Sequence, residues 1–520
     1  RSGDVQAQAI SLTSNQLDNR SGQILSLAQQ GSSLSVAIAE QLDNRAGVVY
    51  SAGGEAVISA DNLLNTAGNV VHAGSGRLLV TAQSIANGAD GVIASNDALW
   101  LQAQQLESAG QLSAQELHIQ AEMLGNSGAI EAANLQLEAT HTHNSGLIAA
   151  QQQLVLNGTT LTNSGTIFSE GNSTLTSTQV TNSGTVAQSG IGVLHLDVLD
   201  SLNNQLGQII SEGTLLLTAG TVNNNQGLIQ TEQGASIVTT NLLNQNGKVL
   251  GLGAHELNIN VQQMLDNTSG VIGATDIVLS AGNLINHAGL VQAEQADITV
   301  TTLNNDNGRL FSDQLQIQTA NLSNHTGLIV ANESLLLQVE QTLDNSRGEL
   351  IITGGNASIT AGILNNDDGI ISQLAGQSLQ LNSGVITNNG GTLHSAQQLN
   401  INAAQFDNSG LVDAATLIVV SDSLTNSGTI QAENARLSST QLLNEGLLLA
   451  SGTVGESLQL DVANGIVNRG HIQSHGQDLI LRDALDNDTG TLVHAGNGEL
   501  QLAQLSNQQG TVYAGNALTI

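Results

Sequence analysis

The chain has 520 residues, among them 57 glycines but no proline and no cysteine. Only 10 residues are Lys or Arg whereas 43 are Asp or Glu, which gives a formal net charge of −33. This charge argues against nucleic acid, heparin-like polymers and anionic lipid as partners, because all three bind clustered basic side chains. The lack of cysteine excludes disulfides and thiolate metal sites, and no stretch approaches the ~20 apolar residues of a membrane span. We therefore expect no cofactor, no nucleic-acid partner and no membrane-spanning segment.

A short phrase recurs along the whole chain: Leu-x-Asn, then one to three residues, then Gly-x-Ile or Gly-x-Val. It begins at Leu17, recurs at Leu161 and is still present at Leu505. About 25 copies follow one another at intervals of roughly 20 residues, which is typical of stacked repeats rather than a globular core. We predict one continuous solenoid shaft over residues 1–520, a fragment of a larger exoprotein that is truncated at both ends. The absence of proline suits this prediction, because each strand N–H in such a stack bonds to a neighbouring turn.

One turn, residues 144–163, shows the expected elements in order. Residues 146–150, 153–158 and 160–163 are short runs of alternating character separated by polar corners, as in β-strands. The second residue after the Gly is aliphatic in essentially every turn, and the residue two before the Asn is apolar in all turns but one. We expect both columns to face inward, with Ile167 and Leu161 as examples. No helical spacing is sustained, so the fold is expected to be all-β.

The repeated asparagine is expected to form a structural corner. Asn tolerates left-handed backbone and can hydrogen-bond within its own turn, and stacked corners would let each amide reach the next one in a ladder. The following Gly would let the chain turn without a Cβ clash. Ser108 replaces the Asn in one turn. The predicted corner ladder contains Asn19, Asn44, Asn65, Asn126, Asn163, Asn182, Asn244, Asn267, Asn286, Asn324, Asn345, Asn426, Asn487 and Asn507.

The spacing between corners lengthens at a few places. It grows after Asn19, Asn244 and Asn444, and more mildly after Asn182. We expect loops there that bulge from the shaft, among them residues 251–254 and 452–456.

The repeat also resembles a known family. Leu-Asp-Asn-Arg-x-Gly-x-Ile/Val at residues 17–24 and 42–49, with Leu-Thr-Asn-Ser-Gly-Thr-Ile at 161–167 and 424–430, is similar to the filamentous haemagglutinin repeat. That repeat occurs in the large two-partner secretion exoproteins of Gram-negative bacteria, which include adhesins and contact-dependent growth inhibition toxins. The resemblance implies a right-handed parallel β-helix (solenoid) of about 25 coils. It also implies a secreted filament on the bacterial cell surface, and an outer-membrane two-partner secretion transporter as partner, through a region not in this chain.

These observations favour a structural and presentational function over an enzymatic one. The expected role is a shaft that holds a receptor-binding, adhesive or toxin region away from the cell, while another region binds the target-cell receptor. An autotransporter-type adhesin passenger would share the fold. A polysaccharide-active β-helix enzyme would need convergent carboxylates with a basic residue; Asp367 and Asp368 are adjacent, but no basic cluster lies near them in sequence. We therefore expect no enzyme, and leave adhesin and toxin stalk as alternatives.

Few residues suggest ligand chemistry. The calcium-binding nonapeptide of other β-solenoids is absent. His141 and His143 share a strand face, and Thr142 between them interrupts the apolar column. His287, Asp306 and His325 follow the corner Asn in three successive turns; the two imidazoles would lie about 9.6 Å apart, too far to share one ion. These five residues are the metal-ligand candidates, with a local irregularity as the alternative at His141.

Two further sets are expected to face outward. The Asp residues that precede a corner Asn should lie in solvent: Asp18, Asp43, Asp266, Asp344, Asp407 and Asp486. The rings three residues after a corner Gly should be isolated and exposed, with receptor contact as one option: Tyr50, Phe168, Phe311 and Tyr513.

Overall fold

The computed structural model describes residues 3–520. The described residues contain 46 β-strands and no α-helix, and no helix among them is long and apolar enough to cross a membrane. The chain divides into two compact units, one ending at Gln262 and the other comprising Gln263–Ile520. Each unit is a parallel β-solenoid with turns of about 20 residues, and the two together contain about 26 turns. The all-β solenoid expected from the repeat is confirmed, whereas its right-handedness and its continuity as one shaft stay predictions.

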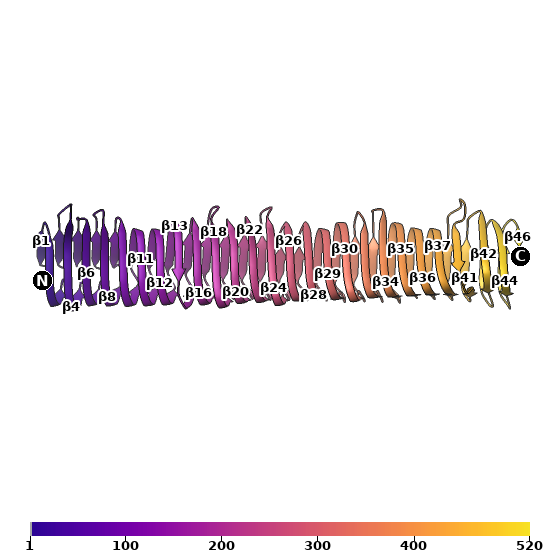
Figure 1. The fold of residues 1–520 in the computed structure, drawn as a ribbon, viewed down its shortest axis with the longest axis horizontal. Helices are drawn as coiled ribbons and strands as arrows, with labels where there is room; N and C mark the ends of the chain where they lie inside the picture. Colours follow the sequence, from indigo (N-terminus) through magenta and orange to yellow (C-terminus); the bar gives the residue numbers. More distant parts are fainter. Residues whose placement is uncertain (1–2) are drawn as a thin grey trace. The chain divides into compact units, whose positions relative to one another are not determined.

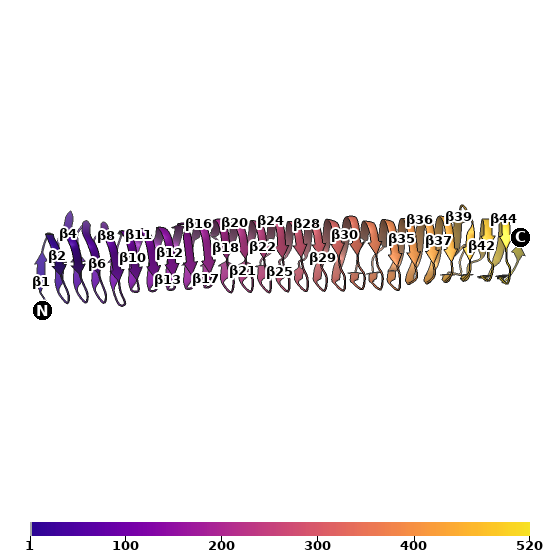
Figure 2. The same cartoon turned by 90° about the horizontal axis from the view of Figure 1, so that it is seen from below.

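Each turn has three extended sides. The first side follows the corner glycine, the second side forms the middle of the turn, and the third side ends at the corner asparagine. In the turn of residues 146–163, β13 (Leu147–Asn157) supplies the first two sides and β14 (Thr160–Asn163) the third. The three runs expected in this turn are therefore present, and Figure 2 shows how successive turns repeat the arrangement within each unit.

In the first unit most turns use a short strand for the first side and a longer, bent strand for the other two. The short strands are β1 (Asp4–Ala7), β3 (Gln23–Ser26), β5 (Val48–Ser51), β7 (Asn69–His72), β9 (Val92–Ser95), β15 (Thr166–Ser169), β17 (Thr185–Gln188), β19 (Gln208–Ser211), β21 (Leu228–Thr231) and β23 (Lys248–Gly251). The long strands are β2 (Ile10–Asp18), β4 (Ser32–Asp43), β6 (Glu55–Leu64), β8 (Arg77–Asn87), β10 (Ala98–Ser108), β16 (Asn172–Asn182), β18 (Val193–Asn203), β20 (Thr214–Asn223) and β22 (Gly234–Leu243), followed by β24 (Glu256–Asp266), within which the division falls. β11 (Gln111–Asn126) and β12 (Ala129–Asn144) run through all three sides.

The second unit repeats this plan. First-side strands are β25 (Val271–Gly273), β27 (Leu290–Gln292), β31 (Glu349–Ile352), β33 (Ile370–Gln373), β38 (Leu447–Ala450), β41 (His471–Ser474), β43 (Thr491–His494) and β45 (Thr511–Ala514). The other sides are formed by β26 (Asp276–Ile285), β28 (Gln295–Asn304), β32 (Ala357–Asn365), β34 (Ser378–Asn388), β39 (Leu458–Val462), β40 (Ile466–Asn468), β42 (Asp478–Asp486), β44 (Asn497–Ser506) and β46 (Leu518–Thr519). Five strands run through all three sides: β29 (Arg309–Ser323), β30 (Leu328–Asp344), β35 (Thr392–Asn408), β36 (Leu411–Asn426) and β37 (Thr429–Asn444).

Parallel pairing between turns aligns like residues into columns. Ile148 pairs with Ile167 on the first side, and Thr142 pairs with Leu161 on the third. Ile167 and Leu161 are each 1% exposed, so their inward direction is confirmed. Each aliphatic side chain buried in this way contributes about 1.5–3 kcal/mol. The columns therefore stabilise every turn through its two neighbours, as in other solenoids.

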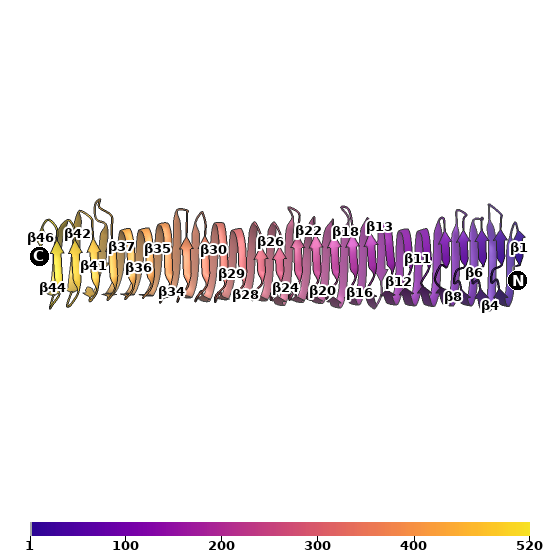
Figure 3. The same ribbon diagram turned by 180° about the vertical axis from the view of Figure 1, so that it is seen from behind.

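The longer connections lie at one bend, between the first and second sides. In the first unit they are residues 27–31, 73–76, 189–192 and 252–255; in the second unit 353–356, 374–377 and 451–457. Figures 1 and 3 show these connections projecting along one edge of each unit. The loops expected near residues 251–254 and 452–456 are confirmed.

The asparagine corner differs from the expectation in one respect. In the longer form of the corner the left-handed residue comes two positions after the Asn, as at Ser21, Ala46 and Ala67, with φ of 53°, 53° and 52°. The Asn itself is not left-handed, so this reason for choosing Asn was wrong. Its side chain, rather than its backbone, distinguishes the position.

Candidate functional site

The asparagine side chains form hydrogen-bonded columns in the interior. In the first unit Asn19 Nδ2 donates to Asn44 Oδ1 at 2.7 Å, and Asn44 Nδ2 donates to Asn65 Oδ1 at 2.7 Å. The same bond connects Asn126 through Asn144, Asn163 and successive corners to Asn244, at 2.7–2.8 Å. Because Asn44 and Asn65 are each 0% exposed, their amides depend entirely on protein partners.

The second unit contains a column of the same kind. It runs through Asn267, Asn286, Asn305, Asn324, Asn345, Asn366, Asn388, Asn408, Asn426, Asn444, Asn468, Asn487 and Asn507, with Nδ2-to-Oδ1 distances of 2.7–2.8 Å. Thus all fourteen asparagines expected at corners lie in the two columns. The structure adds Asn204 and Asn305, which the same Leu-x-Asn phrase could have identified, and others such as Asn87, where Ile85 stands in place of the Leu.

In most corners the asparagine amide also donates to a backbone carbonyl of the next turn. Asn144 Nδ2 donates to Thr166 O at 3.1 Å, just after Gly165 of that turn. The glycine of the motif is needed because a Cβ atom at Gly47 would lie 2.1 Å from Asn19 O of the previous turn. The asparagine amide therefore hydrogen-bonds to the next turn at the place where the glycine, which has no Cβ atom, lets the two turns approach closely.

Two of the aspartates that were expected to face solvent are buried. Asp43 is 6% exposed and Asp266 8% exposed, so the expectation that these carboxylates face solvent was wrong. Arg45 Nη2 donates to Asp43 Oδ2 at 2.6 Å, and the Arg45 guanidinium holds the pKa of the Asp43 carboxyl below its usual value. Asp266 Oδ1 accepts a hydrogen bond from Thr268 N at 3.0 Å. These carboxylates fasten the corner backbone.

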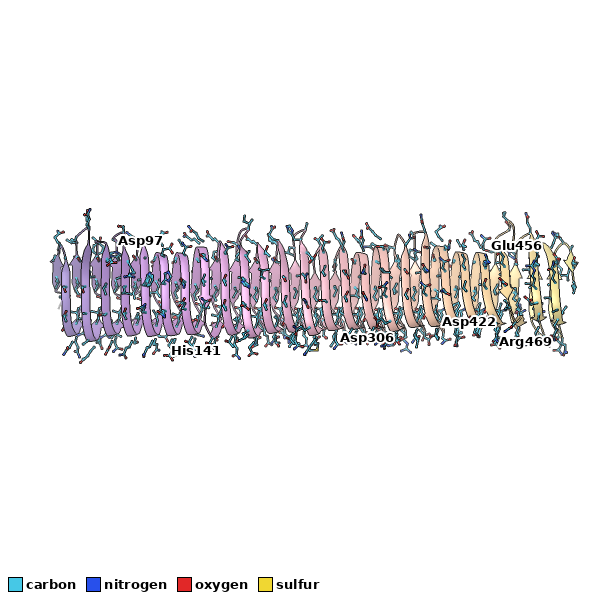
Figure 4. The ribbon with its side chains drawn as sticks, in the orientation of Figure 1. Asp97, His141, Asp306, Asp422, Glu456 and Arg469 are labelled. Atoms are coloured by element: carbon cyan, nitrogen blue, oxygen red, sulfur yellow. The ribbon has the colours of Figure 1, made fainter. Side chains whose placement is uncertain are left out.

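The histidine candidates are not brought together around one point. His141 and His143 are exposed, and His141 Nδ1 lies 2.8 Å from Thr160 Oγ1; Figure 4 shows His141 at the outer edge of its unit. Asp306 Oδ1 accepts a hydrogen bond from His325 N at 3.0 Å, and His325 Nδ1 lies 3.0 Å from Ser346 Oγ. His287 is exposed. Within residues 3–520 no group of three or more His, Cys, Asp or Glu side chains is arranged to hold a metal ion. The expectation of no metal site, with these five residues as the only candidates, stays a prediction.

Two other histidines, not singled out from the sequence, are buried. His72 and His494 end β7 and β43, are 0% and 1% exposed, and are each followed by Ala-Gly-x-Gly. Within the described part of the chain none of their four ring nitrogens has a hydrogen-bond partner. Burial lowers the pKa of His72. Both histidines lie at inward positions of the strand alternation, as Val70 does two residues before His72. This alternation could have identified them from the sequence.

Other polar contacts across turns also escaped the sequence reasoning. Arg347 Nε lies 3.8 Å from Asp368 Oδ2, so a basic residue does approach the Asp367–Asp368 pair, although both partners are well exposed. His394 Nδ1 lies 2.8 Å from Asp413 Oδ2, and Gln431 Nε2 donates to Asp413 Oδ1 at 3.0 Å. Each of these contacts joins residues about one turn apart. Only the register between neighbouring turns reveals them.

The only tryptophan lies in an outward stack on the second side of the first unit. The Trp100 and His118 ring centroids are 4.7 Å apart, and Arg77 Cζ lies 5.1 Å from the Trp100 ring centroid. A depression of about 250 Å³ lies beside these rings. The sequence reasoning missed this cluster, although a single Trp at an outward position was a usable signal.

The chain, a parallel β-solenoid with an asparagine–glycine corner, contains a filamentous haemagglutinin repeat region. Residues 1–46, 374–470, 453–498 and 481–520 match the haemagglutinin repeat family. The chain is also a distant homologue of the CdiA toxins.

Three curated relatives show this similarity. Toxin CdiA of Escherichia coli is 29% identical over 103 residues, which cover 20% of this chain and 3% of that protein. The tRNA nuclease CdiA of Yersinia mollaretii is 27% identical over 218 residues, or 42% of this chain and 6% of that protein. The deoxyribonuclease CdiA of Dickeya dadantii is 27% identical over 334 residues, or 62% of this chain and 8% of that protein. The chain therefore spans less than a tenth of the length of these relatives. No solved structure gives a significant match.

Proposed function

We propose that this chain is a presentational shaft of a large secreted bacterial surface protein. It holds a receptor-binding, adhesive or toxin region away from the cell. The observation that carries the proposal is the repetition of one three-sided turn, with the same asparagine–glycine corner, throughout both units. A stack of this kind grows in length without changing its cross-section, which is the property a spacer requires.

The proposed partners and location follow from the resemblance to two-partner secretion exoproteins. An outer-membrane transporter would export the protein by recognising a region outside this chain, and a target-cell receptor would be bound by another region. The absence of cysteine suits a chain exported unfolded, because no disulfide can obstruct its passage. The CdiA relatives favour a contact-dependent growth inhibition protein over an adhesin. We propose that the segment itself is not catalytic and forms one continuous shaft.

Shortening the chain within the full-length exoprotein tests this function. Deleting residues 20–507 joins Asn19 to Gln508. Because Asn19 then takes the place of the equivalent corner residue Asn507, the corner is preserved while about 24 turns are removed. At ~4.8 Å per turn the surface filament should become about 115 Å shorter, as measured by electron cryotomography of intact cells. Export of the shortened protein, followed with an antibody to its other regions, should continue.

A length-matched control separates spacing from other effects. Replacing the deleted turns with the same number of copies of residues 145–163 should restore the original filament length. A filament of unchanged length after the deletion, or failure of the repeat-replaced protein to restore length, would contradict the shaft function.

A further inference from the structure

A shallow groove lined by both polar and apolar side chains runs along the stacking direction in the first unit. It follows the bend between the second and third sides from β4 to β12 and has a volume of about 760 Å³. Ala60, Ala82, Ala103 and Ala121 lie along it in successive turns. With six turns at ~4.8 Å spacing, the groove extends about 24 Å, which is long enough for an extended polymer rather than a single small molecule.

Some polar groups along this groove are already paired, since Gln83 Nε2 donates to Asp61 Oδ1 at 3.2 Å, whereas three glutamines are not. Gln102, Gln104 and Gln120 line it, and their side-chain amides make no hydrogen bond within the described part of the chain. Gln102 and Gln120 are paired in register, so their amides recur at the strand spacing. Each primary amide offers both donors and an acceptor, so these two neighbouring turns present the same two-way hydrogen-bonding capacity to a ligand. The register partners on either side are Thr81 and Glu138.

The groove continues into the tryptophan cluster. Gln102 and Gln120 also line the depression beside Trp100 and His118, together with Glu138. Trp100 Nε1 has no hydrogen-bond partner among the described residues and is a further donor. Arg77 and His118 cover the Trp100 ring faces along the stack, so the edge of the indole is the part available to a ligand.

Charge and backbone pairing restrict the class of ligand. Asp61 and Glu122 line the groove and no Lys or Arg does, so anionic polymers are disfavoured. Both neighbours of β10 are already paired with it along its length. A peptide therefore has no free strand edge to extend, which is the usual way for an extended peptide to bind a sheet. Hydroxyl groups, which donate and accept, match the free amides best.

We propose that this groove binds a neutral oligosaccharide, laid along the stacking direction with its hydroxyls on the amides of Gln102, Gln104 and Gln120. This inference goes beyond the shaft function, because it assigns a ligand to the shaft itself.

Tryptophan fluorescence of the whole 520-residue chain tests the proposal. Trp100 is the only fluorophore of its kind, so a ligand beside it should shift the emission. The probes are the neutral hexasaccharides of glucose, mannose and N-acetylglucosamine, with polygalacturonate as an anionic comparison and spermine as a cationic one. We expect saturable binding of at least one neutral hexasaccharide and none of polygalacturonate or spermine.

Matched variants locate the binding. The double variant Gln102→Ala with Gln120→Ala should weaken binding of that hexasaccharide at least tenfold. Gln318 and Gln338 are paired in register on the equivalent side of the second unit, and replacing both with Ala should leave the affinity unchanged. Four outcomes would overturn the proposal: no binding by any neutral hexasaccharide, equal binding of polygalacturonate or spermine, full affinity in the first double variant, or equal loss in the second.

Discussion

Ser108 accepts a hydrogen bond from Asn87 Nδ2 at 3.2 Å, whereas Asn126 Oδ1 in the following turn is buried with no partner among the described residues. The column of amides is therefore interrupted between these two corners. At other corners the amide nitrogen of the preceding corner donates to the corresponding oxygen, but the serine side chain is too short to span the distance. A buried carbonyl oxygen without a donor costs about 1–3 kcal/mol, so the interruption is a local weakness.

Replacing Ser108 with Asn should close this interruption. The new amide would donate to Asn126 Oδ1 and accept from Asn87 Nδ2, which should raise the local free energy of opening by about 1–3 kcal/mol. Native-state hydrogen exchange of the β10 and β11 amides measures this quantity directly. Ser127→Asn, one position beyond a corner, is the control and should have no such effect. Unchanged or faster exchange in Ser108→Asn would refute the expectation.

Removing an amide from an intact column should have the opposite effect. Asn305→Ala removes the acceptor of one amide hydrogen of Asn286, whose Nδ2 keeps its bond to Arg309 O. It also removes the donor to Asn324 Oδ1. The buried amide hydrogen and the buried oxygen left unpaired together cost about 2–6 kcal/mol. Denaturant unfolding followed by circular dichroism should show the loss, while the exposed Asn332→Ala should be close to wild type. Equal stability of the two variants would mean that the column does not hold the turns together.

A charge in an inward column should disrupt more than one turn. Ile167→Asp places an unpaired carboxylate at a 1% exposed position between Ile148 and Val186, where neither neighbouring turn can solvate it. We expect new protease cleavage around β13–β17 and reduced β-sheet circular dichroism. Thr166→Asp, on the outward neighbour, should change neither. Retention of protease resistance in Ile167→Asp would show that the column tolerates charge.

The buried His72 should make its turns sensitive to acid. Burial lowers the pKa of His72 below 6.5 in the folded chain, with an opposing influence from Asp97. The unfolded chain therefore binds a proton more readily than the folded one. The stabilising effect of the neutral ring is fully present above pH ~6.5 and is lost as the pH falls towards the folded pKa.

Hydrogen exchange of β7 and β9 between pH 7.5 and 5 measures this dependence, after correction for intrinsic exchange rates. Ser51 and Ser95 occupy the same position in the adjacent turns, so His72→Ser fits the column. That variant can be less stable overall, but its opening free energy should depend less on pH than that of the wild type. An identical pH dependence in both proteins would exclude His72 as the titrating group.

Whole turns should be removable where two corners are equivalent. Deleting residues 145–163 joins Asn144 to Ser164 and preserves the Asn-Ser-Gly corner, so β-sheet content per residue and cooperative unfolding should be retained. Deleting residues 145–154 removes only part of a turn and shifts every later column by part of a repeat. That variant should unfold more easily than the first in denaturant. Equal stability of the two deletions would show that register is not what the stack requires.

The inward columns could be predicted from sequence because each position repeats with its own period. Ile167 and Leu161 are buried for the same reason in every turn, so one turn identifies all the others. The buried Asp43 could not be found this way, because its carboxylate lies beside Arg45 and beside Arg20 of the preceding turn. Arg347 near Asp368 and His118 on Trp100 depend likewise on the spacing between corners, which varies from turn to turn. Predicting a contact between turns requires the register of their pairing, whereas predicting burial within a turn requires only the alternation of inward and outward residues.

The tight approach of Gly47 to the Asn19 carbonyl has a practical consequence for engineering. At that seam even a methyl group has no room, whereas the opposite bend already accommodates segments such as residues 189–192 and 451–457. Foreign epitopes or affinity tags should therefore be grafted at the tips of these segments, where added length costs little closure entropy. Related natural proteins should likewise vary most in sequence and in segment length at this bend.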